Sequence, residues 1–553
     1  MRRNDTSDPH EPAAGAPVPG DPASASADPA TPDPAAPVPA PGAARTLWAS
    51  LRPLVLRMHF YAAVLVAPFI VVAALTGLLY VYTPQLEQAV HADLLGVAPA
   101  DTAVPLSQQV EAAFAAHPEA EPSAVRPSVG PGLTTRVLFD ADGLSESYRL
   151  AVFVDPHTGE VVGDSTSYGS SASLPVRSWL SEFHRTLHLG DAGRLYSELA
   201  ASWLWAVALG GLALWLSRGR RNRRARRVLL PRRSAAGRAR TLSWHGSVGT
   251  WALAGLLLVS ATGLTWSQFA GENIGGIRGA FGWQTPALSA PAPSDHGGHS
   301  GHGDHAGHEA ADPAGEVDAV VDTARSAGLE GPVEVSFPVE DGAPFTVRET
   351  DQSWPVQQDA VAVDPHTDTV VEELRFADFP LMAKLSTWGI AFHMGLLFGV
   401  ANQVLLTVLV LALLAMVFWG YRMWWQRRPT RDGAFATGRP VPRGAWSAAP
   451  PWARVGVVAV AVAVGYLLPV LGVSLLLFLA GEPRRTDRPR PGPGLRGRAP
   501  GRPAQGVPGP GRGRGPPHGG RRPGVPLSPR PPFRGGNGRG PPGRKGARPL
   551  RSP

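Results

Sequence analysis

The stretch LVLRMHFYAAVLVAPFIVVAALTGLLYVY, from Leu54 to Tyr82, decides the fold of this chain. It is predominantly apolar and exceeds the about 20 residues with which a helix crosses the hydrocarbon of a bilayer. Inside it, His59 is followed 17 positions later by Thr76-Gly77-Leu78. An unpaired imidazole is costly in an apolar medium, so a histidine in such a helix is a candidate functional residue.

The second half of the chain repeats this arrangement. His245 is followed 17 positions later by Thr262-Gly263-Leu264. Downstream, Asp155-Pro156-His157-Thr158 and Asp364-Pro365-His366-Thr367 each lie 29 positions before the histidine of a Phe-His-x-x-Leu-x-x-Gly motif, at His184 and at His393. The repeat predicts tandem duplicated pairs of transmembrane helices with four matched histidines.

The composition is that of a membrane protein with smaller water-facing parts, because the apolar residues occur in blocks. The net charge of +8 comes largely from arginines beside these blocks and from the tail after Gly481. Basic low-complexity tails are often only solvated, so nucleic acid is not an expected partner. The chain has no cysteine, which excludes disulfides, iron–sulfur clusters and Cys-ligated zinc. Any metal or haem must therefore have His, Met or oxygen ligands.

Arginine clusters predict the topology, because cytoplasmic loops are enriched in Arg and Lys. They lie at the start of the first apolar segment, after the second and after the fourth, so these ends are expected in the cytoplasm. We predict an α-helical integral membrane protein with two extracytoplasmic α+β modules. The expected parts are a disordered cytoplasmic arm (1–47), transmembrane segments (48–84, 176–217, 241–269 and 381–425), outer modules (85–175 and 270–380), a basic cytoplasmic loop (218–240) and a disordered Pro/Gly/Arg-rich tail (481–553).

A fifth apolar stretch, residues 452–480, has two interpretations. It is long enough to cross the membrane, but Pro469 lies near its middle. A full crossing would place the Arg-rich tail outside, against the charge rule, whereas a hairpin would have arms short for about 30 Å of hydrocarbon. We favour a hairpin or tilted insertion with the tail inside.

Both outer regions have the pattern of a helix followed by strands and a turn. We expect helices at Leu106–Ala116 and Val317–Ala327. Strands are expected at Tyr148–Val154, Val333–Phe337, Phe345–Glu349 and Ala360–Val363.

In the duplicated order of these motifs, residues 50–480 resemble the PepSY-associated transmembrane proteins. This family includes iron-regulated inner-membrane proteins and siderophore-iron reductases with membrane haem. The resemblance implies that the outer modules are PepSY-like and that the protein lies in a bacterial plasma membrane.

The histidines can be assigned to the two faces of the membrane. His59 and His245 lie near the starts of segments that enter from the cytoplasm, and His184 and His393 precede segments that enter from outside. Two repeats related by a twofold axis along the membrane normal would bring each pair face to face. This arrangement predicts two bis-histidine haems, of the b type. The alternative is that each histidine caps a helix or bonds a neighbouring span; four matched positions favour ligation.

Residues near these histidines have less specific interpretations. Gly77, Gly246, Gly249, Gly263, Gly395 and Gly399 provide room for a macrocycle, or are present only because glycine is common in membrane helices. His188 is an alternate ligand, a supporting group or, as we favour, a solvated interface residue. Arg185 and Arg194 hold haem propionates or acidic substrate, or contact lipid headgroups.

A separate histidine tract lies in the second outer region. His296, His299, His302, His305 and His308 recur at every third position among Gly, Ser and Asp. Such a tract gathers imidazoles around Zn²⁺, Cu²⁺ or Ni²⁺, and the alternative is a solvated low-complexity loop. His157 and His366 are interpreted as turn residues rather than ligands.

No nucleotide-binding glycine motif or HExxH motif occurs, so the chain offers no nicotinamide or flavin domain of its own. Electrons would arrive from a quinol or from a separate cytoplasmic donor. The favoured hypothesis is a di-haem oxidoreductase that passes electrons outward to a ferric siderophore. The alternative is a non-enzymatic protein whose outer modules bind peptide, protease or metal as an inhibitor or sensor.

Overall fold

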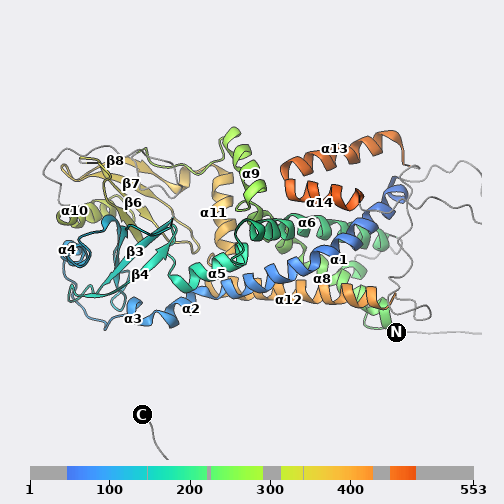
Figure 1. Cartoon of the computed structure of the whole chain (residues 1–553), viewed down its shortest axis with the longest axis horizontal. Coiled ribbons are helices and arrows are strands. Elements are labelled where there is room, and N and C mark those ends of the chain that lie inside the picture. Colours follow the sequence, from blue (N-terminus) through green and yellow to red (C-terminus); the bar gives the residue numbers. More distant parts are fainter. Residues whose placement is uncertain are drawn as a thin grey trace, which may run out of the picture. The chain divides into compact units, whose positions relative to one another are not determined.

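A computed structural model describes residues 47–145, 147–220, 226–289, 313–340, 342–427 and 449–480 of this chain. The histidine tract at 296–308, the N-terminal arm and the C-terminal tail lie outside these ranges. Helices form most of the described chain, and the strands form one antiparallel sheet (Figure 1).

Among the described residues, four helices are long and apolar enough to cross a membrane. They are α1 (Leu47–Val81), α6 (Gly190–Arg220), α8 (Gly237–Leu264) and α12 (Gly399–Trp425). Helix α1 packs against α6 and α12, and α8 packs against the same two helices. The chain is therefore a multi-pass membrane protein with a four-helix core.

The predicted segments 176–217 and 381–425 are each divided into a short helix and a long one. Helix α5 (Pro175–Thr186) ends where Leu187 and His188 have positive φ, and α6 follows. Helix α11 (Leu381–His393) ends before Gly395, which has a φ of 81°, and α12 follows. A left-handed residue cannot continue an α-helix, so each break redirects the chain just after a histidine.

Additional helices pack beside the four-helix core. Residues 451–480 form a helical hairpin of α13 (Pro451–Leu467) and α14 (Pro469–Ala480), which turns at Leu468. The two arms are short because the break lies near the middle of the stretch. Helix α9 (Gln268–Ala280), which the sequence did not predict, packs on α6 and on this hairpin. Its first backbone N–H groups, those of Phe269 and Ala270, donate to the buried Glu198 carboxylate.

The sheet contains eight strands in the order β4-β3-β2-β1-β5-β6-β7-β8, each antiparallel to its neighbours. The first four are β1 (Glu121–Arg126), β2 (Thr135–Asp140), β3 (Tyr148–Val154) and β4 (Val161–Tyr168). The last four are β5 (Val333–Ser336), β6 (Phe345–Glu349), β7 (Ala360–Asp364) and β8 (Thr369–Leu374). The predicted strand at Tyr148–Val154 is confirmed with the same bounds.

The two outer regions are not separate modules, as the sequence suggested, but share this one sheet. Strand β1 pairs with β5, with Val125 opposite Val335. Helix α4 (Leu106–Ala116), confirmed as predicted, packs against α10 (Pro313–Ser326). Both helices bury apolar side chains in the same hydrophobic core as strands from both halves. Burial of apolar surface across the junction stabilises the two regions as one domain.

Short elements complete the described chain. They are α2 (Thr83–Val90), α3 (Ala92–Leu95), α7 (Arg226–Leu229) and the 3-10 turn η1 (Phe376–Asp378).

Candidate functional site

The first histidine pair consists of His59 on α1 and His245 on α8. Their ring centroids lie 6.4 Å apart, with 76° between the ring planes. The Nδ1 atom of His59 lies 2.9 Å from the backbone oxygen of Val207 on α6, and that of His245 lies 3.0 Å from the oxygen of Met416 on α12. All four long helices therefore contribute to this pair.

The second pair consists of His184, in the last turn of α5, and His393, the last residue of α11. Their ring centroids are also 6.4 Å apart, with 52° between the planes. The Nδ1 atom of His184 lies 3.0 Å from Oγ1 of Thr76, and that of His393 lies 2.7 Å from Oγ1 of Thr262. The Thr-Gly motifs thus hold the second pair.

These hydrogen bonds fix the tautomer of each imidazole. A carbonyl oxygen can only accept, so Nδ1 of His59 and of His245 must carry the proton. The Thr76 hydroxyl donates to the Val72 carbonyl at 2.9 Å, and that of Thr262 donates to Leu258 at 2.8 Å. Each threonine therefore accepts from its histidine. In all four rings Nδ1 carries the proton, which leaves Nε2 with a free lone pair.

Glycines allow neighbouring helices to approach these rings closely. A Cβ atom on Gly211 of α6 would lie 2.8 Å from Cε1 of His59. A Cβ on Gly77 would lie 3.0 Å from Cε1 of His184, and one on Gly263 would lie 3.5 Å from Cε1 of His393. Since contacts below 3.0 Å require something to shift, Gly211 is the most constrained of the three.

The other candidate glycines have different surroundings. Gly246 packs against the Trp215 ring, and Gly249 lies near Sδ of Met416. Gly395 and Gly399 have positive φ at the break between α11 and α12. The sequence missed Gly211, although this glycine makes the closest approach to a histidine.

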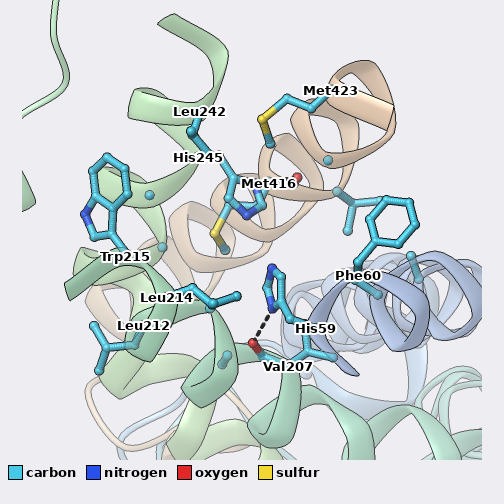
Figure 2. Close-up of a pocket in the computed structure, with 18 of the residues that line it drawn as sticks. His59, Phe60, Val207, Leu212, Leu214, Trp215, Leu242, His245, Met416 and Met423 are labelled. Carbon is cyan, nitrogen blue, oxygen red and sulfur yellow. Dashed lines mark hydrogen bonds between the residues drawn. The ribbon is translucent and has the colours of Figure 1, made fainter. Parts of the chain in front are cut away.

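A cavity of about 350 Å³ lies beside the first pair, between the four long helices. Figure 2 shows His59 and His245 among the side chains that line it, with the bond from His59 to Val207 drawn. Most of the lining is aliphatic or aromatic, including Leu56, Phe60 and Trp215. The cavity therefore suits a flat apolar group that reaches the two Nε2 atoms.

The two pairs lie at opposite ends of α1. Thr76, which contacts His184, is 17 residues after His59. At 1.5 Å per residue this offset corresponds to about 26 Å along the helix axis, close to the thickness of the hydrocarbon core.

Other residues that the sequence highlighted do not join these pairs. The His188 ring stacks on Phe183 and lies 4.7 Å from the Trp179 ring. Arg185 donates to Glu182 at 2.8 Å and to the Tyr168 hydroxyl at 3.3 Å, and Arg194 is exposed. The backbone N–H groups of His157 and His366 donate to Asp155 and Asp364, as expected for turn residues.

Within the described residues, no group of three or more His, Asp or Glu side chains is arranged to hold a metal ion. The candidate metal ligands of the tract, His296, His299, His302, His305 and His308, lie outside those residues.

Comparison with known protein families gives a match. Residues 56–427 match the PepSY-associated TM region, which covers more than half of the sequence. The chain belongs to the PepSY-associated TM family. A comparison with curated proteins gives no match. Membership of this family agrees with a multi-pass membrane protein. The histidine pairs of this PepSY-associated chain are seen in its structure and do not come from the family match.

The roles of Thr76 and Thr262 were not apparent from the sequence, although the repeated 17-position offset marked both. Helical spacing places Thr76 and Thr262 at the opposite end of their helices from His59 and His245. The spacing does not show that His184 of α5 and His393 of α11 contact these threonines.

Proposed function

We propose that this protein is a di-haem membrane oxidoreductase that passes electrons outward to a ferric siderophore. The observation that carries the proposal is the matched geometry of the two histidine pairs. In each pair the ring centroids are 6.4 Å apart and every Nδ1 lies within hydrogen-bond distance of an oxygen. Among the described residues, none forms a hydrogen bond with any of the four Nε2 atoms. The matched pairs also support a tandem duplication of the helix pairs and outer regions.

The ring separation fits a haem b in each pair, and the cavity beside His59 and His245 adds space for one at the first pair. A metal-bound imidazole nitrogen lies about 2 Å from the metal, so ring centroids 6.4 Å apart would leave room for one metal ion between the two imidazoles of each pair. A haem supplies its own four equatorial nitrogens, which is why two protein ligands suffice. The two histidines of each pair would hold the iron of a haem, which would supply one-electron chemistry.

Residues of the chain set the basicity of the histidine ligands and the distance over which electrons would pass. The carbonyls of Val207 and Met416 and the hydroxyls of Thr76 and Thr262 accept hydrogen bonds from Nδ1, which orients each ring and raises its basicity. The offset of about 26 Å along α1 allows two cofactors to relay electrons across most of the bilayer. The positive-inside rule assigns the His59 pair to the cytoplasmic side and the sheet domain to the outside.

The remaining partners follow from chemistry. Reduction weakens hard-oxygen chelation of iron, so an outward electron flow would release iron from a ferric siderophore. The donor is a quinol or a separate cytoplasmic protein. We place the protein in a bacterial plasma membrane, as the family resemblance implies.

Four substitutions test the ligand assignment. His59→Ala and His245→Ala should each remove one haem, and His184→Ala and His393→Ala should each remove the other, because both axial ligands are needed for stable low-spin binding. Pyridine haemochrome per protein should fall from two to one. His366→Ala, an exposed turn residue, serves as the control and should retain two.

Two results would contradict the proposal. Two haems in all four variants would end the ligand assignment. A colourless full-length wild-type protein would favour the alternative function, in which the sheet domain binds peptide, protease or metal and the helices serve as anchor or sensor.

A further inference from the structure

Four arginines line the same cavity as His59 and His245. Three of them belong to the long helices α1, α6 and α8, and the fourth lies just after α12. Arg52 lies near the start of α1 and Arg238 in the first turn of α8, while Arg218 lies near the end of α6 and Arg427 just after α12. We call these four residues the arginine rim. Because all four line one cavity, these helix ends lie on the same side of the membrane.

Two arginines of the rim have the same spacing from the histidines in both halves of the chain. Arg52 lies seven residues before His59, and Arg238 lies seven residues before His245. Seven residues are about two helical turns, so each arginine lies on the face of its histidine, about 10 Å along the helix. The rim on α1 and α8 is therefore positioned relative to the histidines.

The other two arginines show the same regularity. Arg218 lies 11 residues after Val207, and Arg427 lies 11 residues after Met416. Val207 and Met416 are the residues whose carbonyls accept from the two histidines. Eleven residues are about three turns, which again keeps each arginine on the face that meets the cavity.

The charges of the rim lack an internal counterion. Among the described residues, no carboxylate forms an ion pair with any of the four arginines. Arg238 lies in the first turn of α8, where the helix dipole disfavours a cation. A bound anion would offset both the mutual repulsion and the dipole.

The positive-inside rule explains why arginines lie at this side of the membrane, but not why four of them line one cavity at repeated distances from the histidines. We infer that the arginine rim binds the two propionate carboxylates of the haem held by His59 and His245. Guanidinium groups pair bidentately with carboxylates, so two propionates can engage four arginines. This inference rests on the proposed function and fixes the orientation of that haem, with its carboxylate edge toward the rim.

The test uses haem whose propionates have been esterified. Full-length protein carrying His393→Ala, which leaves only the inner site, is prepared haem-free and titrated in detergent with haem b or with its dimethyl ester. The esters cannot form charge-assisted bonds, so haem b should bind at least about tenfold more tightly. Equal affinity for acid and ester would overturn the inference and leave the arginines as contacts for lipid phosphates.

Substitutions locate the effect in the rim. Adding Arg218→Gln and Arg427→Gln, which leaves Arg52 and Arg238, should reduce the preference for the acid several-fold. It should also lower the midpoint potential of the inner haem, because lost cations favour the ferric form. Arg240→Gln, an exposed arginine on α8 outside the cavity, is the matched control and should retain both properties. A rim variant that keeps the full preference would contradict the assignment.

Two further results separate the possible causes of a negative outcome. Arg→Lys replacements at the same positions preserve the topology signal if the Gln variants fail to insert, and should still weaken the preference. A wild-type protein without any haem would overturn the proposed function together with this inference, whereas a haem protein indifferent to esterification would overturn the inference alone.

Discussion

At the scale of single residues, the site depends on where four protons lie. Each imidazole donates from Nδ1 to a fixed oxygen, and for His184 and His393 that oxygen belongs to a threonine whose own proton is already donated to the backbone. The threonine can therefore only accept from the ring. This arrangement presents Nε2 as a ligand without any further adjustment.

Replacement of Thr76 by Val should weaken haem binding at the His184 pair by about 10- to 100-fold, as is usual for groups that orient a metal ligand. The buried Nδ1–H would lose its acceptor, and the ring would rotate more freely. Haem titration of the variant in a His59→Ala background measures this affinity. Thr407→Val on α12, which makes the same bond to the carbonyl four residues earlier, is the control. Unchanged affinity for Thr76→Val would show that the hydroxyl does not support the ligand.

The sequence predicted the four histidines because their spacing repeats, and it predicted their pairing from topology. It could not predict Val207 and Met416 as partners, because any residue can offer a carbonyl. A backbone acceptor does not require any particular amino acid at its position, so the sequence does not reveal it.

At the scale of elements, helix packing decides whether the rings fit. Helix α6 approaches α1 so closely that a Cβ on Gly211 would lie 2.8 Å from the His59 ring, whereas one on the adjacent Gly210 would lie 3.8 Å from Cβ of His59. The first distance requires a shift of the ring or of the helix. The second is an ordinary contact.

These neighbours form a matched pair of variants. Gly211→Ala should displace His59 and reduce the haem content from two per protein to about one, because one axial ligand is misplaced. Gly210→Ala should retain both. Pyridine haemochrome with low-temperature absorption spectra distinguishes them, and full haem content in Gly211→Ala would mean that the helices adjust without cost to the ligand.

The central strand pair of the sheet depends on a buried ion pair. Glu334 on β5 is 5 % exposed and accepts from Nε of Arg126 on β1 at 2.6 Å. Glu334→Gln would leave Arg126 buried without a counter-charge and should lower the free energy of unfolding of the sheet domain by about 3–5 kcal/mol. Hydrogen exchange of the β1 and β5 amides measures the loss. Glu340→Gln, an exposed carboxylate, should leave exchange unchanged, and equal protection in both variants would contradict the role of the pair.

The same pair makes the sheet sensitive to acid. Burial raises the pKa of Glu334, but Arg126, Arg149 and Arg348 lower it more, so that it lies below the ordinary value of 4.5. A lowered pKa means that the stabilisation is complete above 4.5 and is lost as the pH falls through the lower, folded-state pKa. Protection of β1 and β5 should therefore fall more steeply below that pH in wild type than in Glu334→Gln. Parallel profiles would exclude Glu334 as the titrating group.

Sequence alternation predicted several strands but not their arrangement in one sheet. Strands β1 and β5 are separated by about 200 residues, and an alternating pattern shows which face is buried without identifying the neighbouring strand. Glu334 lies between two valines in the strand Val-Glu-Val-Ser. This alternation does not indicate that the glutamate is buried or that Arg126 is its partner.

At the scale of the whole molecule, the positions of the two histidine pairs predict the direction of electron flow. In the proposed orientation, His59 and His245 lie on the cytoplasmic side and His184 and His393 lie outside. If both pairs bind haem as proposed, a membrane-impermeant ferric chelate should reoxidise the outer haem first. The inner haem should follow through it.

Sealed vesicles of known orientation provide the measurement. In stopped-flow absorbance, His393→Ala should leave the inner haem reduced after an outside addition of the chelate, while wild type reoxidises both haems. Equal reoxidation of the inner haem in the variant would rule out the relay.

Each histidine pair takes one ligand from either half of the chain, and this has a consequence for biosynthesis. His59 and His184 are translated before His245 and His393. Strand β1 likewise has no neighbour at β5 until the second half is complete. A chain released midway would hold two solitary imidazoles in lipid and an open sheet edge, so no partial product could accept cofactor. If the pairs bind haem as proposed, its insertion would have to follow completion of both halves of the polypeptide.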